Sequence, residues 1–220
     1  MQKIKICGIT NEQEIDKLIE LNVDYAGFVV FFPKSRRNND IVRASELVSY
    51  VRKKKAASEK EIPLKTVAVT VSPDIWQLEA IENAGFDILQ IHGELYDEVR
   101  EKTGLPIWRA FNLSSYKDND SLSTGLKKVV SDDKIRGIVF DGAGYGGGEV
   151  FEWTSLKDID IKDKLFIMAG GLTPENVAEA VKTLNPNIVD VSSGVEYDDK
   201  TIAGKDLEKT ERFVRAVRSS

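Results

Sequence analysis

Polar and glycine-rich residues follow several short apolar segments of this chain. A thiol, a carboxyl group and guanidinium groups among them suit proton transfer and the binding of an anion. If the apolar segments are parallel strands, these residues meet at one edge of a sheet or at one end of a barrel. They are Cys7-Gly8, Ser35-Arg36-Arg37, His92-Gly93, Asp141, Gly170-Gly171 and Ser192-Ser193-Gly194.

Cys7 and Asp141 are the candidates for acid–base chemistry. Cys7 precedes a predicted helix, whose N-terminus could lower the thiol pKa and make it reactive, although a free Cys is more often a small buried hydrophobe. Asp141 leaves an apolar segment, where an unpaired carboxylate would be costly, and it opens a loop with five glycines that ends at Gly148. Its alternative role is to cap a turn.

The two loops around Gly170-Gly171 and Ser192-Ser193-Gly194 together predict a phosphate site. Small residues let backbone N–H groups approach a ligand, and Thr173-Pro174 indicates a helix start nearby that would attract an anion. Paired loops of this kind after the seventh and eighth strands recur in barrels. Each loop alone could equally be a tight turn.

Arg36, Arg37 and His92 are weaker candidates. Either arginine could hold a carboxylate or phosphate through two hydrogen bonds, although at least one of the two is expected to be an ordinary surface residue. A lone His at a strand end is more often hydrogen-bonded and structural than catalytic.

Eight short apolar segments, each followed by a helix or a helix-sized gap, must position these residues. The segments alternate little between apolar and polar residues, which is typical of strands buried on both faces. We therefore predict a single (β/α)8 barrel over residues 1–220, with a doubly wound sheet as the alternative. The predicted strands are Lys3–Cys7, Tyr25–Phe32, Lys65–Val71, Ile88–Ile91, Ile107–Phe111, Gly137–Phe140, Leu165–Ala169 and Ile188–Val191.

Three helix starts carry recognisable capping signals. Thr10 with Gln13 resembles a capping box, and Ser72 and Thr173 each precede a Pro that could occupy the first helical position.

The composition excludes several classes of protein. One Cys and one His among 220 residues can supply neither an internal disulfide nor a Cys/His zinc site, and we expect no metal. The net charge of −5 argues against a general nucleic-acid binder. No stretch approaches the roughly 20 apolar residues that span a bilayer, and the first residues lack the apolar run of a signal peptide. We expect a cytoplasmic protein.

The ordered motifs of the chain resemble phosphoribosylanthranilate isomerase. The resemblance runs in order from about residue 3 to about residue 210, and its first and fifth motifs are highly specific. The motifs are Lys5-Ile6-Cys7-Gly8-Ile9-Thr10, Gly27-Phe28 with Ser35-Arg36-Arg37, Gln90-Ile91-His92-Gly93, Ala169-Gly170-Gly171-Leu172 with Pro174-Glu175-Asn176, Val189-Asp190-Val191-Ser192-Ser193-Gly194-Val195-Glu196, and Gly204-Lys205-Asp206.

The resemblance implies a cofactor-free Amadori rearrangement in tryptophan biosynthesis on a (β/α)8 barrel. It implies Cys7 as general base, Asp141 as general acid and Arg37 as the ligand of the anthranilate carboxylate, with Arg36 as the second candidate. Gly170, Gly171, Ser192, Ser193 and Gly194 would hold the phosphate, and His92, Gly146 and Gly147 would complete the pocket. The chemistry needs a raised Asp141 pKa and a lowered Cys7 pKa.

Two alternatives remain at this stage. A different phosphate-binding barrel, such as a sugar-phosphate epimerase or aldolase, would want metal ligands or a strand-end Lys. A binding module that had lost turnover would be expected to lack Cys7 or Asp141, and both are present. The expected partner is a small phosphorylated substrate, with no nucleic acid and no membrane, for a monomer or homodimer.

Overall fold

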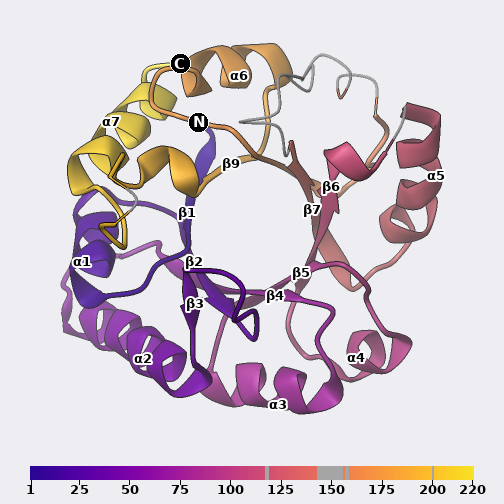
Figure 1. Cartoon of the computed structure of the whole chain (residues 1–220), viewed down its shortest axis with the longest axis horizontal. Coiled ribbons are helices and arrows are strands. Elements are labelled where there is room, and N and C mark those ends of the chain that lie inside the picture. The colour runs from indigo at the N-terminus through magenta and orange to yellow at the C-terminus, as the bar shows by residue number, and fades with distance from the viewer. Residues whose placement is uncertain (117–118, 143–155, 157–158, 200) are drawn as a thin grey trace.

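The chain forms a ring of parallel strands surrounded by helices (Figure 1). The computed structural model describes residues 1–116, 119–142, 156, 159–199 and 201–220, without the side chains of 119 and 120. The ring closes because β1 pairs with both β2 and β9, so that Ile6 lies opposite Ala26 on one side and Val191 on the other. Closure confirms the (β/α)8 barrel and excludes the doubly wound sheet. Its strands are β1 (Lys3–Cys7), β2 (Tyr25–Val30), β4 (Lys65–Val71), β5 (Ile88–His92), β6 (Ile107–Asn112), β7 (Ile135–Asp141), β8 (Leu165–Ala169) and β9 (Ile188–Val191).

Apolar side chains fill both sides of the strands, which explains why the strand sequences alternate so little. One cluster lies inside the ring and includes Val67, Val139 and Ile167, each with 0% exposure. Tyr25 and Trp108 meet edge to face within this cluster, with ring centroids 5.0 Å apart. A second, larger cluster lies between the strands and the helices. The barrel interior is therefore packed, and a ligand must bind at one of its ends.

A short strand, β3 (Asn38–Asn39), pairs with the end of β2. The expected strand Tyr25–Phe32 is two residues shorter than predicted, because Phe31 has a left-handed φ of 56° that ends the pleat. The Asn38 side chain then accepts a hydrogen bond from the Phe32 N–H at 2.8 Å. This turn carries Ser35-Arg36-Arg37 back toward the end of β1.

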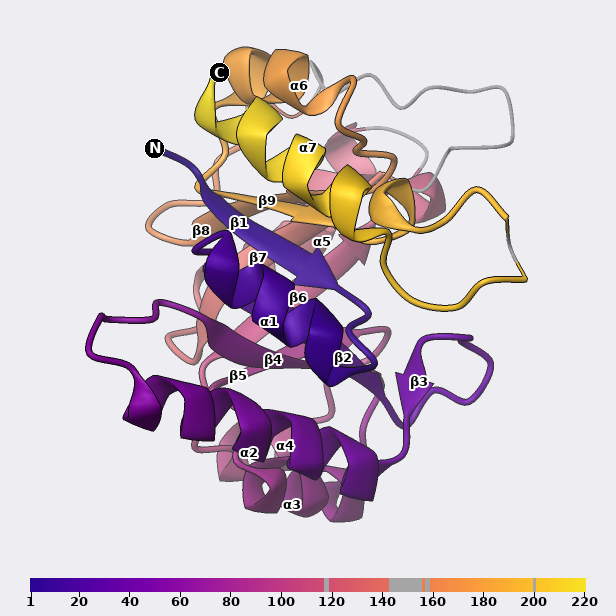
Figure 2. The same cartoon turned by 90° about the vertical axis from the view of Figure 1, so that its left-hand side faces the viewer.

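Helices cover the outside of the ring. They are α1 (Glu12–Glu20), α2 (Ile41–Ala57), α3 (Ile75–Ala84), α4 (Asp97–Lys102), α5 (Asn119–Val130), α6 (Val177–Leu184) and α7 (Leu207–Arg218), with 3₁₀ turns η1 (Leu113–Ser115) and η3 (Ser193–Val195). Figure 2 shows α1 and α7 on the outside of β1, where Lys17 and Glu211 form an ion pair at 2.8 Å. None of the helices in the described ranges is both long enough and apolar enough to cross a membrane.

The helix starts differ from the capping predictions. Asn11, not Thr10, caps α1, and Asp74, not Ser72, caps α3 in a capping box with Gln77. In both cases an Asn or Asp lies one or two residues after the hydroxyl residue and competes with it for the cap position. Asn and Asp are at least as good as Ser and Thr as helix caps. Thr173 bonds the Glu175 N–H at 3.2 Å, but α6 begins only at Val177.

Candidate functional site

A cavity of about 420 Å³ opens at the carboxyl ends of the strands, where active sites of (β/α)8 barrels lie. It brings together most of the residues singled out from the sequence, namely Cys7, Arg37, His92, Asp141, Gly170, Gly171, Ser192 and Ser193. Arg36 and Gly194 lie beside the lining, and Gly146 and Gly147 lie outside the described residues. The lining also includes Gln90 and Asp190, to which sequence reasoning gave no role.

Asp141 and Cys7 reach the cavity from the ends of β7 and β1. Burial raises the pKa of Asp141 above its usual range, and the negative charge of Asp190 raises it further, against an opposing effect of Lys5. The raised Asp141 pKa matches the expectation from the sequence. Burial of this kind favours the protonated form of a carboxyl group, from which a proton can be donated.

The pKa of Cys7 moves in the direction opposite to the prediction. Burial raises it, and the positive charges of Lys5 and Lys205 offset this effect only in part. The expected helix contribution is absent because α1 begins at Glu12, with its cap at Asn11, several residues beyond the thiol. The Gly8 and Ile9 N–H groups instead bond the carbonyl oxygen of Gly27, at 2.8 and 2.9 Å.

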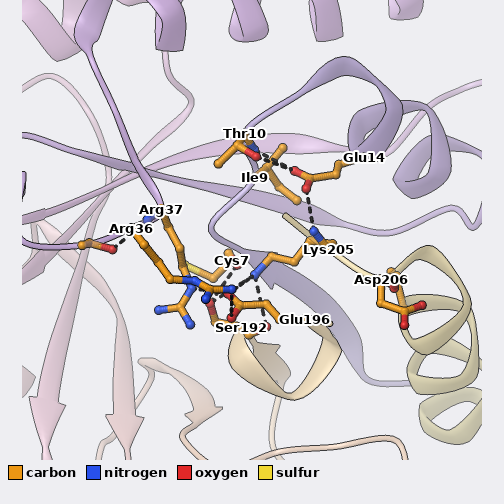
Figure 3. A network of polar contacts seen from close by, with 12 residues as sticks. Cys7, Ile9, Thr10, Glu14, Arg36, Arg37, Ser192, Glu196, Lys205 and Asp206 are labelled. Carbon is orange, nitrogen blue, oxygen red and sulfur yellow. Dashed lines mark hydrogen bonds and ion pairs between the residues drawn. The ribbon is translucent and has the colours of Figure 1, made fainter. Parts of the chain in front are cut away.

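Arg37 is held at the rim of the cavity by a buried carboxylate (Figure 3). Its Nε donates to Glu196 Oε1, which also accepts from Lys205 Nζ at 3.3 Å, while Arg36 Nη2 donates to Glu196 Oε2 at 3.1 Å. Burial favours the neutral acid, but the bonds from Arg37 and Lys205 outweigh it and lower the Glu196 pKa. We name Arg36, Arg37, Glu196 and Lys205 the rim cluster.

The stem of Arg37 packs against the backbone at Gly8. A Cβ on Gly8 would lie 2.5 Å from Cδ of Arg37, and the φ of Gly8 is 84°. The aliphatic stem of Arg37 therefore crosses directly over the backbone next to Cys7, which only a glycine permits. Arg37 lines the cavity beside Cys7, whereas Arg36 does not line it.

The glycine- and serine-rich loops after β8 and β9 pack closely around the other side of the cavity. A Cβ on Gly170 would lie 2.4 Å from the backbone N of Gly142, and one on Gly194 would lie 1.9 Å from the Leu172 carbonyl oxygen. Ser192 Oγ donates to the Cys7 carbonyl at 2.9 Å. The loops are therefore joined to each other and to β1, with Gly170, Gly171, Ser192 and Ser193 facing the cavity.

His92 is the last residue of β5 and keeps its imidazole neutral. Burial, helped by the charges of Lys5 and Arg109, lowers its pKa to about 4. Its Nε2 lies 3.0 Å from Nε2 of Gln90, within hydrogen-bond distance. The ring lines the cavity, and the structural role expected for His92 stays a prediction.

Besides Asp190, sequence reasoning also missed charged residues that surround Arg37 and the loops. Lys205 and Glu196 belong to motifs that were noticed but given no role, and Glu14 of α1 joins them. One Glu14 oxygen accepts from the Lys205 N–H and the other from the Thr10 N–H, both at 2.7 Å (Figure 3). The signal available in the sequence was that both residues lie inside the ordered motifs, Glu196 shortly after Ser192-Ser193-Gly194 and Lys205 directly after Gly204.

Within the described ranges, no three His, Cys, Asp or Glu side chains are grouped as metal ligands would be. A closed barrel, with an acid, a thiol and an arginine facing paired small-residue loops, defines a class: barrel enzymes that bind a small anionic molecule at the strand ends. Residues 4–216 match the family model for N-(5′-phosphoribosyl)anthranilate (PRA) isomerase. The chain belongs to the N-(5′-phosphoribosyl)anthranilate isomerase family.

Individual relatives and solved structures agree with this membership. The N-(5′-phosphoribosyl)anthranilate isomerase of Rhodospirillum rubrum is 40% identical over 228 residues, covering 98% of this chain and 97% of the relative. The phosphoribosyl anthranilate isomerase of Thermotoga maritima superposes with a TM-score of 0.80 at 26% identity over 100% of both chains. A complex of such an enzyme with reduced 1-(o-carboxyphenylamino)-1-deoxyribulose 5-phosphate has a TM-score of 0.78 at 25% identity, again over 100% of both chains.

Proposed function

We propose that Asp141 and Cys7 carry the proton transfers of the family's reaction in this chain. The chain is an isomerase of the aldose–ketose type: it converts N-(5′-phosphoribosyl)anthranilate to 1-(o-carboxyphenylamino)-1-deoxyribulose 5-phosphate in tryptophan biosynthesis. The observation that supports the assignment is that Asp141 and Cys7 line the same cavity as Arg37 and the two small-residue loops.

Asp141 acts first, as the general acid. It protonates the ring oxygen of the phosphoribosyl group, the C1′–O bond breaks, and the anilino nitrogen supplies the electrons that form a protonated Schiff base. The raised pKa of Asp141 suits this donation, because a carboxyl group that was ionised at working pH would have no proton to give.

Cys7 then acts as the general base. The Schiff base acidifies the C2′ proton, the Cys7 sulfur removes it, and the resulting enolamine tautomerises to the ketone. Since burial raises the Cys7 pKa, the thiolate needs cationic support, which Lys5 and Lys205 supply. Each proton transfer is worth about 10²–10⁴-fold in rate.

The two ends of the substrate occupy opposite sides of the cavity. Arg37 binds the anthranilate carboxylate through the edge of its guanidinium group that Glu196 does not use. Gly170, Gly171, Ser192, Ser193 and Gly194 hold the phosphate by way of backbone N–H groups and hydroxyls. His92, which is neutral, contributes shape and hydrogen bonding.

No step of this mechanism calls for a metal or a cofactor. The partner is a small phosphorylated molecule, and we place the reaction in the cytoplasm. Neither nucleic acid nor a membrane takes part, and the choice between monomer and homodimer stays a prediction.

The direct test follows the loss of substrate fluorescence with purified protein in the presence of EDTA. Wild-type protein should turn over, and Cys7→Ala and Asp141→Asn should each lower kcat about 10²–10⁴-fold while still binding the reduced product analogue. Asp163→Asn, at an exposed carboxylate, is the matched control and should keep the wild-type kcat. Full activity of Cys7→Ala or Asp141→Asn would show that the assigned acid or base is wrong.

A further inference from the structure

A buried ion pair lies beneath the catalytic residues, inside the barrel. Lys5 of β1 and Asp190 of β9 are direct neighbours in the strand register, and their Nζ and Oδ2 atoms lie 2.6 Å apart. Their side chains are 0% and 6% exposed. Removing two charges from water is costly, and an apolar pair of similar volume would fill the same space as well or better. Stability alone therefore does not account for this pair.

The lysine end of the pair is next to Cys7. The two residues are two apart on one strand, so their side chains share the inner face of the barrel. A Cβ placed on Gly27 of the neighbouring strand would lie 3.0 Å from Cys7 Sγ and 3.2 Å from Lys5 Cε. The sulfur and the lysine stem thus border the same small space, which a glycine leaves open.

The carboxylate end of the pair faces the cavity. Asp190 lines the cavity together with Asp141, whereas Lys5 lies behind the lining. Asp190 Oδ1 is buried and has no hydrogen-bond partner among the described residues. An unsatisfied charged oxygen in a low-dielectric interior acts strongly on nearby titratable groups.

The two ends of the pair shift the pKa values of Cys7 and Asp141 in opposite directions. On Cys7 the effect of Lys5, which lowers the pKa, exceeds that of Asp190, which raises it. On Asp141 the effect of Asp190, which raises the pKa, exceeds that of Lys5, which lowers it. The pair is thus oriented like a dipole between the two catalytic groups.

We propose that Lys5 and Asp190 are positioning residues that hold protons where the reaction needs them: the Lys5 ammonium stabilises the Cys7 thiolate, and the Asp190 carboxylate keeps the proton on Asp141. This inference rests on the catalytic roles proposed for Cys7 and Asp141. One buried pair then serves both groups, and it does so without touching the substrate.

Other charges face the same groups. The Lys205 charge acts on Cys7 from the rim cluster, and Arg37 lines the same cavity; both are bonded to Glu196. His92 faces the cavity from β5 and is neutral above a pKa of about 4. Neither Lys5 nor Asp190 belongs to the rim cluster, so both can be substituted without removing one of its members.

The test uses the fact that Cys7 is the single cysteine of the chain. The rate of its alkylation by iodoacetamide reports the thiolate without requiring turnover. Lys5→Met should slow alkylation at pH 7 at least about tenfold, because the cation beside the sulfur is lost. Lys17→Met removes a lysine of similar pairing on α1, away from the cavity, and should alkylate at the wild-type rate.

The double variant Lys5→Met/Asp190→Asn keeps the shape of both side chains and leaves no unpaired charge, so it preserves the fold if Lys5→Met alone does not. Its alkylation should also be slower. In the pH profile of kcat/KM, the acidic limb should move to lower pH and the basic limb to higher pH, and the maximum should fall. The limbs separate because the Asp141 pKa falls and the Cys7 pKa rises, and the maximum falls because thiolate and protonated carboxyl then coexist in a smaller fraction of molecules.

The outcomes separate the proposals. Wild-type alkylation rates in Lys5→Met and in the double variant overturn the role of Lys5, even if Cys7→Ala is inactive. Slower alkylation with an unmoved acidic limb overturns the role of Asp190. If Cys7→Ala keeps its turnover, the function assigned to Cys7 fails, although the alkylation data still measure the effect of Lys5 on the thiol.

Discussion

Two buried contacts between a lysine and a carboxylate, among the residues that the structure describes, differ in how completely the carboxylate is bonded. Inside the ring, Asp190 accepts from Lys5 at one oxygen, and its other oxygen has no partner in the described ranges. At the rim, both oxygens of Glu196 are bonded to cationic groups. The pKa shifts follow from this difference: burial raises the Asp190 pKa despite Lys5, whereas bonds from Arg37 and Lys205 overcome burial and lower that of Glu196.

This contrast separates two tasks. The charges of the rim cluster are bonded to one another, so the cluster fixes the geometry of Arg37 and the loops. The interior pair retains an unpaired oxygen, so its charge reaches neighbouring groups. Changes at the rim should therefore alter stability and KM, whereas changes in the interior should alter kcat and its dependence on pH.

Glu196→Gln should have the largest effect on stability. It leaves Lys205 buried without its carboxylate partner, and such losses cost about 3–5 kcal/mol. Urea unfolding measures the free energy of unfolding. Glu175→Gln breaks the exposed pair with Arg212 and should cost at most about 1 kcal/mol. Equal losses in the two variants would mean that the rim cluster stabilises no more than a surface pair.

Arg37→Ala should raise KM about 10- to 100-fold with a smaller change in kcat, because a hydrogen bond to a charged group is worth about 1.5–3 kcal/mol. Arg36→Ala is the matched control, since Arg36 shares Glu196 but does not line the cavity. Its KM should stay close to the wild-type value. Steady-state kinetics at varied substrate concentration distinguishes them, and the reverse ranking would assign the carboxylate to Arg36.

Gly8→Ala probes the point where the two regions meet, between Cys7 and Arg37. The left-handed backbone costs an alanine about 1–2 kcal/mol, and the Cβ would also displace the stem of Arg37. We expect a lower Tm together with a raised KM. Gly104→Ala, whose Cβ would come no closer than 3.9 Å to Glu82, should show neither change. A normal KM in Gly8→Ala would show that substrate binding by Arg37 does not depend on this glycine.

His92 should produce the smallest effect, a change in the dependence of stability on pH. The imidazole binds a proton at a pKa of 6.5 when unfolded but of about 4 when folded, because burial opposes its charge. Its contribution to stability is thus complete above pH 6.5 and is lost as the pH falls toward 4.

His92→Gln should therefore flatten the fall in Tm between pH 7 and pH 5, as followed by circular dichroism. The limbs of the kcat/KM profile should stay where Cys7 and Asp141 set them. A basic or acidic limb that disappeared in His92→Gln would place His92 among the groups that move protons.

The local sequence pattern predicted which segments are strands, but it did not predict the end of β2 or the caps of α1 and α3. The apolar runs identified all eight barrel strands, because burial on both faces leaves a clear signature. Asn11 and Asp74 displaced Thr10 and Ser72 as caps, since several capping side chains stood within reach of each helix start. β2 ends where Phe31 adopts a left-handed φ, which is uncommon for a residue other than glycine and is not predictable from the sequence pattern.

The sequence alone left a doubly wound sheet open as an alternative to the barrel. It did determine the eight strands, the order of the family's motifs and most of the candidate residues that line the cavity, because apolar runs and ordered motifs are local properties. Only the tertiary structure decided what surrounds them. The pairing of Lys5 with Asp190 depends on closure of the ring between β1 and β9, which brings together residues 185 positions apart. The position of Arg37 at the cavity depends on a stem that packs on Gly8 and a carboxylate 159 residues away. The pKa of Cys7 likewise reflects burial and neighbouring charge, which no sequence spacing reveals.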